Sequence, residues 1–294
     1  RRIAPDRGAT DGGEAGVVMI TAPGIFDVPE LDYHADRLLA PQLGRSLSAS
    51  GMKTILRCPA LFQHEREHGR TASDSMGIGT VAHALALGNP DSRLRVYDAY
   101  DWRAKAHQAG RAADRAQRLT PVHRGELRQA SRIAASVRRH ATARNILSRG
   151  EAERSVYWID DDTGVTCRAR VDWLRDDVIV DFKTAADASP AGFARAVANF
   201  RYDIAAAHYI EGVKAVTGHD LPYVFVVAET APPHLCAVYQ LDPGDLEWGR
   251  YDAARARRIY AECESSGEWP DYGDEIHTLD LPAWFRRTRE ADAA

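Results

Sequence analysis

Cysteine is scarce and scattered in this chain of 294 residues. Its four cysteines (Cys58, Cys167, Cys236 and Cys263) lie far apart, and no two of them form a C-x-x-C pair. Zinc and iron–sulfur sites draw on closely spaced cysteines, so this spacing gives such sites little support. Scattered thiols also fit a reducing compartment better than a disulfide-stabilised protein, and the sequence therefore predicts a cytoplasmic location.

Long apolar segments are missing as well. No run of about 18 apolar residues is present, so no membrane-spanning segment is expected. The chain opens with "RRIAPDRGATDGGEAG", which is polar, rich in glycine and not followed by the apolar stretch of a secretory signal. We expect a disordered tail over 1–23, one folded domain over 24–287 and a short tail over 288–294.

Lysine is rare among the charged residues. Of 38 basic residues, four are lysines: Lys53, Lys105, Lys183 and Lys214. Because the chain uses arginine almost everywhere else, a lysine at 183 indicates that a compact, rotatable ammonium is needed there.

Net charge is −4, which taken alone argues against a nucleic-acid-binding protein. The charge is unevenly distributed, however. Between 103 and 149, eleven arginines and one lysine face Asp114 and Glu126, a net of +10 that leaves −14 for the rest of the chain. Such asymmetry is typical of a surface that binds a polyanion. A solvated helical face is the alternative.

Apolar periodicity predicts helices on both sides of a block of strands. Around 48–69 a helix has Ser48 or Ser50 as its N-cap, and Pro59 bends or splits it. Around 119–140 Thr120 is the expected N-cap, with Pro121 at the first helical position. Further helices are expected at 74–88, at 189–218 after the Ser189 cap (one helix or a broken pair), and at 243–267.

Three strands are expected between 153 and 185, with turns at "DDDTG" and "RDD", and two more between 222 and 242. Helices that flank one central mixed sheet indicate a single α/β domain.

Charged residues interrupt the strand "VIVDFKTA". Asp181 and Lys183 are two residues apart, so on a strand they point to the same face. Asp172, near the end of the preceding strand, completes the pattern D-x8-D-x-K, and Glu153 begins the first strand of the block. Carboxylates and a backbone carbonyl, here that of Phe182, are ligands that Mg²⁺ or Mn²⁺ accepts.

Such a set suits hydrolysis of a phosphodiester, in which a metal neutralises charge and a lysine orients or activates water. The alternative for Asp181 and Lys183 is a surface salt bridge at a strand end. Asp172 alone fits an ordinary turn or strand-end residue.

Several segments carry a resemblance. "GVTCRARVDWL…VIVDFKTA" resembles the core of PD-(D/E)xK nucleases, a restriction-endonuclease-like fold with a central mixed sheet flanked by helices. More narrowly, the chain resembles the RecE-type (exonuclease VIII-like) exonucleases of phages and prophages. The segments that carry this narrower resemblance lie in order from Asp32 to Phe285: "DYHAD", "LSASGMKTILRCPALF", "GIGTVAHALALG", "ERSVYW", "TGVTCRARVDWL", "VIVDFKTA", "YDIAAAHYIEG" and "WPDYGDEIHTLDLPAWF".

The resemblance implies roles for individual residues. His83, Glu153, Asp172, Asp181 and the Phe182 carbonyl would form the metal site, with Lys183 as the catalytic ammonium. DNA would be contacted by Ser48, Ser50, Lys53, Arg170 and Tyr209. A lone histidine on an apolar helix is otherwise a packed core residue, and Ser48 alone reads as a plain N-cap. One departure stands out, because Ala205 occupies the position where the family usually has glutamine.

The resemblance also implies a function. The expected protein is a metal-dependent exonuclease that digests one strand of linear double-stranded DNA from its ends, 5′ to 3′. It would leave 3′ single strands for a RecT-type annealing protein and would form a ring-shaped homo-oligomer in the cytosol of a bacterial host.

Two alternatives stay open. One is a RecB-like or other PD-(D/E)xK nuclease, although the cysteine spacing of iron–sulfur members is missing. The other is a DNA-binding module whose nuclease site has decayed, for which Ala205 is the sequence support.

Overall fold

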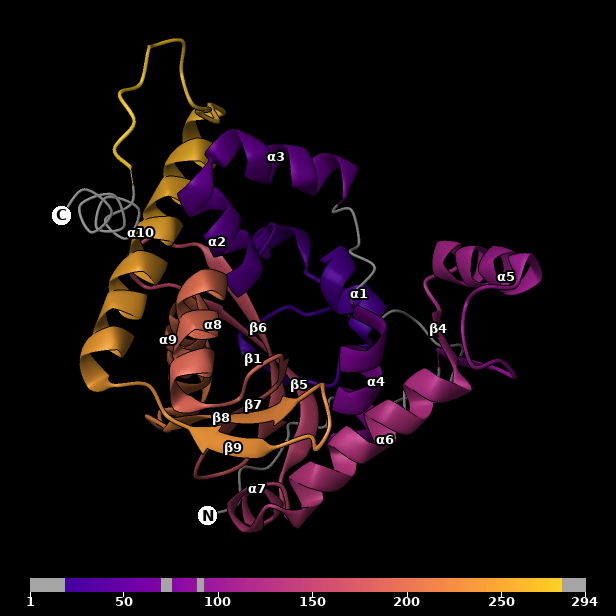
Figure 1. Ribbon diagram of the computed structural model, residues 1–294. Coiled ribbons are helices and arrows are strands. Elements are labelled where there is room, and N and C mark those ends of the chain that lie inside the picture. The colour runs from indigo at the N-terminus through magenta and orange to yellow at the C-terminus, as the bar shows by residue number, and fades with distance from the viewer. Residues whose placement is uncertain (1–18, 70–75, 89–92, 282–294) are drawn as a thin grey trace, which may run out of the picture.

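The computed structural model describes residues 19–69, 76–88 and 93–281 (Figure 1). Most of the expected N-terminal tail, 1–18, and all of 288–294 lie outside these ranges. Within 19–23, Ile20 is buried and forms a β-bridge with Leu39. The domain limits at 24 and 287 stay predictions.

A seven-stranded mixed sheet forms the centre of the fold. Its neighbours β7 and β8 are parallel, and the other successive pairs are antiparallel. A short strand, β2 (Leu47–Ser48), pairs in parallel with β6. In spatial order the remaining strands are β1 (Gly24–Phe26), β5 (Glu151–Ile159), β6 (Thr166–Leu174), β7 (Ile179–Ala185), β8 (Tyr223–Glu229) and β9 (Cys236–Tyr239). The predicted block of three strands and the later pair are confirmed.

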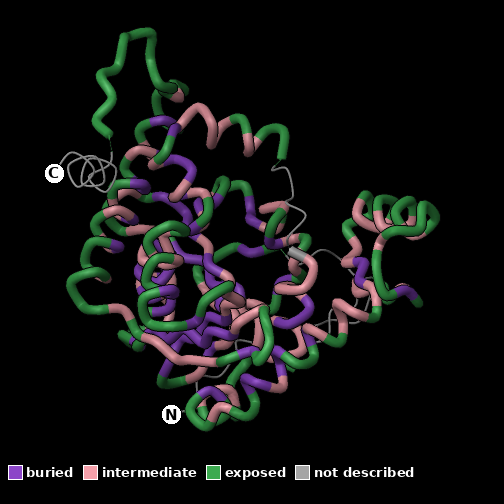
Figure 2. Tube along the Cα trace, viewed as in Figure 1, coloured by how far each residue is buried: buried purple, intermediate pink, exposed green. Residues whose placement is uncertain are grey.

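Helices cover both faces of this sheet, which confirms the predicted α/β class (Figures 1 and 2). Central strands such as β8 are apolar on both faces because each face packs against a helical layer. One layer contains α2 (Ala49–Arg57), α8 (Pro190–Phe200), α9 (Tyr202–Thr217) and α10 (Pro243–Ser266). The other contains α4 (Met76–Ala86), α6 (Arg124–Arg139) and α7 (Ala141–Ile146).

Helix ends follow the local sequence at several points. The Ser48 hydroxyl accepts a hydrogen bond from the Gly51 N–H at 3.2 Å and caps α2. Pro59 splits the predicted first helix, so that α3 (Pro59–His68) follows α2 as a separate helix. After the Ser189 cap, the predicted broken pair is α8 and α9, separated by Arg201 in a left-handed conformation.

The expected N-cap at Thr120 was wrong. Thr120–His123 is strand β4, which pairs in parallel with β3 (Leu94–Tyr97). His123 caps α6 instead: its Nδ1 accepts from two backbone N–H groups, and the Glu126 carboxylate accepts from the His123 N–H. Val122 is fully buried between these elements. This burial outweighs the local preference of a Thr-Pro step for a helix start.

Helix α5 (Lys105–Ala116) and the β3–β4 pair extend from the side of the main body (Figure 1). Short helix α1 (Glu30–Ala35) and the 3₁₀ turn Pro41–Leu43 connect β1 to β2. Among the described residues, no helix is both long and apolar enough to cross a bilayer.

Candidate functional site

The candidate site lies where β6 and β7 separate. The two strands pair at Trp173–Val180 and at Leu174–Ile179. Beyond these pairs β7 continues alongside β8, while the same edge of β6 is taken up by β2. The strands therefore diverge as a fork, and Asp172 and Asp181 come from its two arms just past the last pairs.

Asp181 and Lys183 form an ion pair on one face of β7, as strand alternation predicts. Asp181 is 4% exposed and Lys183 is half-buried. A surface salt bridge does not fit this burial. Asp172 reaches across the fork, where its Oδ2 accepts a hydrogen bond from the Phe182 N–H at 2.8 Å.

His83 enters the site from α4. Its Nδ1 lies 3.2 Å from Glu153 Oε1, and its Nε2 lies 3.1 Å from Asp172 Oδ2. The imidazole thus bridges the carboxylates of two neighbouring strands, β5 and β6. The four charged core residues and His83, which are spread over more than 100 positions of the sequence, are brought together in the fold.

Glu153 has an unusual backbone. Its φ is 58°, in the left-handed region, which costs a non-glycine residue about 1–2 kcal/mol. The β5–β6 register pairs Ala152 with Trp173 and Arg154 with Val171, so Glu153 stands opposite Asp172, and the pairing is interrupted between them. Like charges placed directly opposite each other destabilise a sheet. The altered backbone turns the Glu153 side chain towards His83 and Arg170.

Burial and charge shift the pKa values of these groups in opposite directions. Burial alone would lower the pKa of His83, but Asp172 and Glu153 outweigh it and raise that pKa to about 9. Burial also raises the pKa of Asp181 to about 6, with help from Asp172 and against Lys183. For Asp172 the burial effect is overcome by His83 and Lys183, which hold its pKa well below the usual range.

Burial likewise raises the pKa of Glu153, although His83 and Arg170 oppose the shift. Burial is thus the main cause of the raised pKa values of Asp181 and Glu153, because the three carboxylates already face three cationic side chains: His83, Lys183 and Arg170. A metal ion bound here would take the place of the His83 proton as a partner of the carboxylates.

The donor types in the fork fit a divalent metal. The three carboxylates are ligands that Mg²⁺ or Mn²⁺ accepts, whereas an imidazole is a ligand of transition metals rather than of Mg²⁺. Across the described residues, however, no group of three or more His, Cys, Asp or Glu side chains is arranged to hold an ion as it stands. Both ring nitrogens of His83 are engaged by carboxylates, and Asp181 is engaged by Lys183. Metal ligation by these residues stays a prediction.

The predicted phosphate-contact residues lie beside this cluster. Ser48 and Ser50 place their hydroxyl oxygens 3.1 Å apart at the start of α2. Lys53, one turn further along, has its ammonium 5.3 Å from the centre of the Tyr202 ring. The Lys183 ammonium lies at the same distance from that ring. Burial and the charge of Lys183 lower the pKa of Lys53 to about 8.

The remaining predicted residues point inward. Tyr209 is half-buried on α9 with its ring 6.2 Å from that of Tyr223, and burial raises its pKa. Ala205 precedes Tyr209 by four residues on α9 and is buried. The Arg170 guanidinium is bonded to Glu153, Ser155 and the Val28 carbonyl. DNA contacts of Tyr209 and Arg170 stay predictions.

Sequence reasoning missed two features of the site. Tyr202 links Lys53 to Lys183 through its ring, although its position in "YDIAAAHY" was the only signal for it. Tyr33 of "DYHAD" packs beneath Arg168 and Arg170 at 5.4 and 5.7 Å from its ring centre. All four cysteines are free, and three of them are buried.

Comparisons with known proteins agree with this fold. A family described as "PDDEXK-like domain of unknown function (DUF3799)" matches residues 48–282. A crystal structure from Eubacterium rectale, named "Putative exonuclease", is similar at 16% identity and a TM-score of 0.60, over 89% of this chain and 98% of the other. An alkaline exonuclease from Laribacter hongkongensis matches at 14% identity and a TM-score of 0.24, over 72% and 93%. No curated protein matches the chain.

Proposed function

This chain belongs to the PDDEXK-like family, and from its site we propose that it is a metal-dependent nuclease acting on DNA. One observation carries the proposal. Glu153, Asp172, Asp181, Lys183 and His83 converge in a half-buried fork of the sheet, and three of them, Asp172, Asp181 and Lys183, form the D-x8-D-x-K pattern. Buried charged groups that perturb one another are more often found at functional sites than at ordinary surfaces.

The finer part of the proposal is a RecE-type exonuclease. It would digest one strand of linear duplex DNA from the 5′ end and leave a 3′ strand for a RecT-type annealing protein. The ordered sequence segments support this assignment, and the fold shared with the Eubacterium rectale protein is compatible with it. A ring-shaped homo-oligomer belongs to the same proposal, and light scattering on the purified chain tests it.

In this function the chain's own residues have distinct tasks. His83, Glu153, Asp172, Asp181 and the Phe182 carbonyl would hold the metal. When bound, the ion supplies Lewis-acid chemistry that neutralises charge on the phosphate and acidifies a water. Lys183 keeps its proton, because Asp181 and Asp172 outweigh burial and hold its pKa above the ordinary value. A protonated Lys183 orients the attacking water and stabilises charge that develops on the phosphate.

Lys53, Ser48 and Ser50 would bind a phosphate of the DNA next to Lys183. Two hydroxyls and an ammonium at a helix start form a suitable anion site. The shared contact of Lys53 and Lys183 with Tyr202 supports their acting on neighbouring phosphates.

Helix α6 supports a wider contact with duplex DNA. Four of its arginines are spaced by four, four and seven residues, which at about 100° per residue places them within about 80° of one another. They face away from the buried side formed by Ala130, Ile133 and Val137. We call this set the α6 arginine row: Arg124, Arg128, Arg132 and Arg139. It spans about 22 Å, close to seven base pairs.

Two members of the row have partners. Arg124 pairs with Asp98 at 2.9 Å, and Arg128 lies over the Tyr100 ring at 5.0 Å. Arg132 and Arg139 are exposed and form no ion pair with the described residues. The row is therefore available to phosphates, with an affinity that falls as salt rises.

The test incubates the wild-type protein and Lys183→Ala with end-labelled linear duplex DNA and with covalently closed circles, in Mg²⁺ and in EDTA. We expect metal-dependent loss of linear DNA alone, abolished in Lys183→Ala, with the released label giving the polarity. Cut circles would identify an endonuclease. DNA binding with no cleavage in Mg²⁺ would refute the enzyme and favour a decayed site.

A further inference from the structure

The segment between β1 and β2 lies across β6 and is fixed to it by two arginines. We call residues 27–46 the N-terminal strap. The Arg168 Nη1 donates to the Ser46 carbonyl at 2.7 Å and pairs with Asp36 at 2.8 Å. The Tyr33 ring is 5% exposed and packs against the guanidinium groups of both Arg168 and Arg170. The "DYHAD" motif thus acts as the anchor of the strap.

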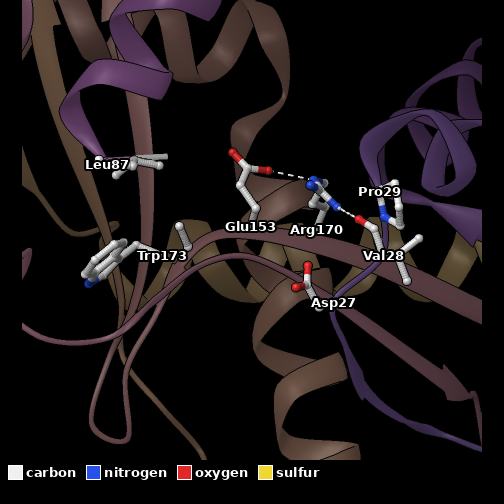
Figure 3. A pocket seen from close by; sticks show the side chains of 9 residues that line it. Asp27, Val28, Pro29, Leu87, Glu153, Arg170 and Trp173 are labelled. Atoms are coloured by element: carbon white, nitrogen blue, oxygen red, sulfur yellow. Dashed lines mark hydrogen bonds and ion pairs between the residues drawn. The ribbon is translucent and has the colours of Figure 1, made fainter. Parts of the chain in front are cut away.

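Arg170 connects this strap to the candidate site. Its Nε donates to Glu153 Oε2 at 2.6 Å, and its Nη1 donates to the Val28 carbonyl at 2.6 Å (Figure 3). The same Nη1 also donates to the Ser155 hydroxyl at 3.1 Å. The side chain is 14% exposed. Glu153 and Arg170 also line an open cleft of about 560 Å³, together with Asp27 and Trp173. The guanidinium is therefore partly accessible to solvent, but its hydrogen bonds go to Glu153, Val28 and Ser155.

We propose that Arg170 is a positioning residue that holds the Glu153 carboxylate in the metal site, and that the Val28 carbonyl and the Ser155 hydroxyl hold Arg170 in turn. This inference rests on the proposed function, because it assigns Arg170 a task for the metal centre rather than a contact with DNA. A guanidinium that moved to a phosphate would leave the half-buried Glu153 carboxylate without its arginine partner.

The backbone of Glu153 supports this role. A left-handed residue inside a strand persists only where its surroundings hold it. Two groups hold the Glu153 side chain, with His83 on Oε1 and Arg170 on Oε2. If a metal draws His83 away from Glu153, Arg170 becomes the remaining restraint. Without it, the strand relaxes towards regular pairing with β6 and the carboxylate leaves the fork.

Loss of a partner that orients a metal ligand typically weakens metal binding by 10- to 100-fold. The test titrates Mn²⁺ into the full chain and follows free Mn²⁺ by electron paramagnetic resonance, without DNA. We expect Arg170→Gln to weaken Mn²⁺ binding by about 10- to 100-fold, and Arg170→Lys by less, because one ammonium keeps one of the bonds. Glu153→Gln together with Arg170→Gln should bind no more weakly than Glu153→Gln alone.

Arg168→Gln is the matched control. It removes an arginine two residues away, on the same strand and against the same Tyr33 ring, but one that contacts no expected metal ligand. We expect it to bind Mn²⁺ within twofold of the wild type. Thermal unfolding of every variant confirms that the chain is folded, and if Arg170→Gln unfolds, Arg170→Lys against Arg168→Lys gives the same comparison.

Three results would overturn the inference. The first is that Arg170→Gln binds Mn²⁺ like the wild type, whether or not the variant has lost affinity for DNA. The second is a double variant whose losses multiply, because Arg170 would then not act through Glu153. The third is an equal loss in Arg168→Gln, which would reduce both arginines to general stability. If the wild-type protein binds no Mn²⁺, the result refutes the metal centre of the proposed function itself, and with it the role of Arg170.

Discussion

Replacing His208 should change how the stability of this protein depends on pH. His208 lies on α9 and is fully buried, with its ring 4.6 Å from that of Trp158. Its Nε2 lies 3.0 Å from the Arg168 carbonyl, to which a neutral ring donates a hydrogen bond. Its Nδ1 is buried without a hydrogen-bond partner among the described residues. A second proton therefore has no acceptor.

Burial, opposed by the hydrogen bond to the Arg168 carbonyl and helped by the charges of Arg257 and Arg168, lowers the pKa of His208 to about 3. In the unfolded chain the imidazole titrates near pH 6.5. Below that pH the unfolded state takes up a proton that the folded state refuses, so stability is full above pH 6.5 and is lost as the pH falls towards 3. Between pH 7.5 and 5.0 this loss amounts to about 2 kcal/mol.

The assay is urea unfolding followed by tryptophan fluorescence, at pH 7.5 and at pH 5.0, for the wild type and His208→Gln. The glutamine amide can still donate to the Arg168 carbonyl, but it takes up no proton. We expect the variant to be less stable at pH 7.5, because it loses the ring packed on Trp158. The difference in the free energy of unfolding between the wild type and the variant should change by about 2 kcal/mol in favour of the variant when the pH is lowered from 7.5 to 5.0.

His219→Gln provides the control, since His219 is exposed on the turn after α9. If the free energies of unfolding of the wild type and His208→Gln differ by the same amount at both pH values, the reasoning is refuted. Such a result would mean that His208 is charged in the folded state or that the unfolded state does not take up the proton. An equal shift in His219→Gln would assign the effect to the unfolded chain.

Three further changes have expected outcomes. A Cβ on Gly212 would come within 2.4 Å of the Trp158 ring, so Gly212→Ala should lower the free energy of unfolding, measured in urea, by about 1–3 kcal/mol. Gly77 has open space around the position of a Cβ, so Gly77→Ala should raise the same free energy by up to about 1 kcal/mol. Lys53→Gln should lower the salt slope of duplex binding by about 0.9, and Lys214→Gln, paired with Asp220, should leave it unchanged. Replacing all four arginines of the α6 arginine row with glutamine should lower the salt slope of duplex binding by about 3.6. The same replacement of four arginines in the opposite helical layer should leave the slope unchanged: Arg195, Arg250, Arg255 and Arg258.

Much of the site could be predicted because its signals are local. Alternation along β7 places Asp181 and Lys183 on one face, and short turns connect β5, β6 and β7, so three carboxylates were expected on adjacent strands. The fork itself could not be predicted, since it depends on β2, more than 100 residues earlier, taking the edge of β6.

Long-range contacts account for the other failures. Arg170 bonds to Val28 across 142 positions, so its sequence neighbours gave no hint that it points inward. Lys53 and Tyr202 meet from separate helices for the same reason. At Thr120–Pro121, the local helix-start pattern was clear but was overridden when Val122 was buried between β3 and α6.

The missing pair between Glu153 and Asp172 sets folding stability against the proposed metal site at one point of the sheet. Every other step of β5 from Glu151 to Ile159 finds its partner on β6. Here the chain gives up one pair and accepts a disfavoured backbone so that two carboxylates face a shared centre. A substitution that removes either carboxylate also removes the repulsion between Glu153 and Asp172, so β5 and β6 can pair at this position. The missing pair and the disfavoured backbone therefore lower folding stability at the point where the proposed metal site lies.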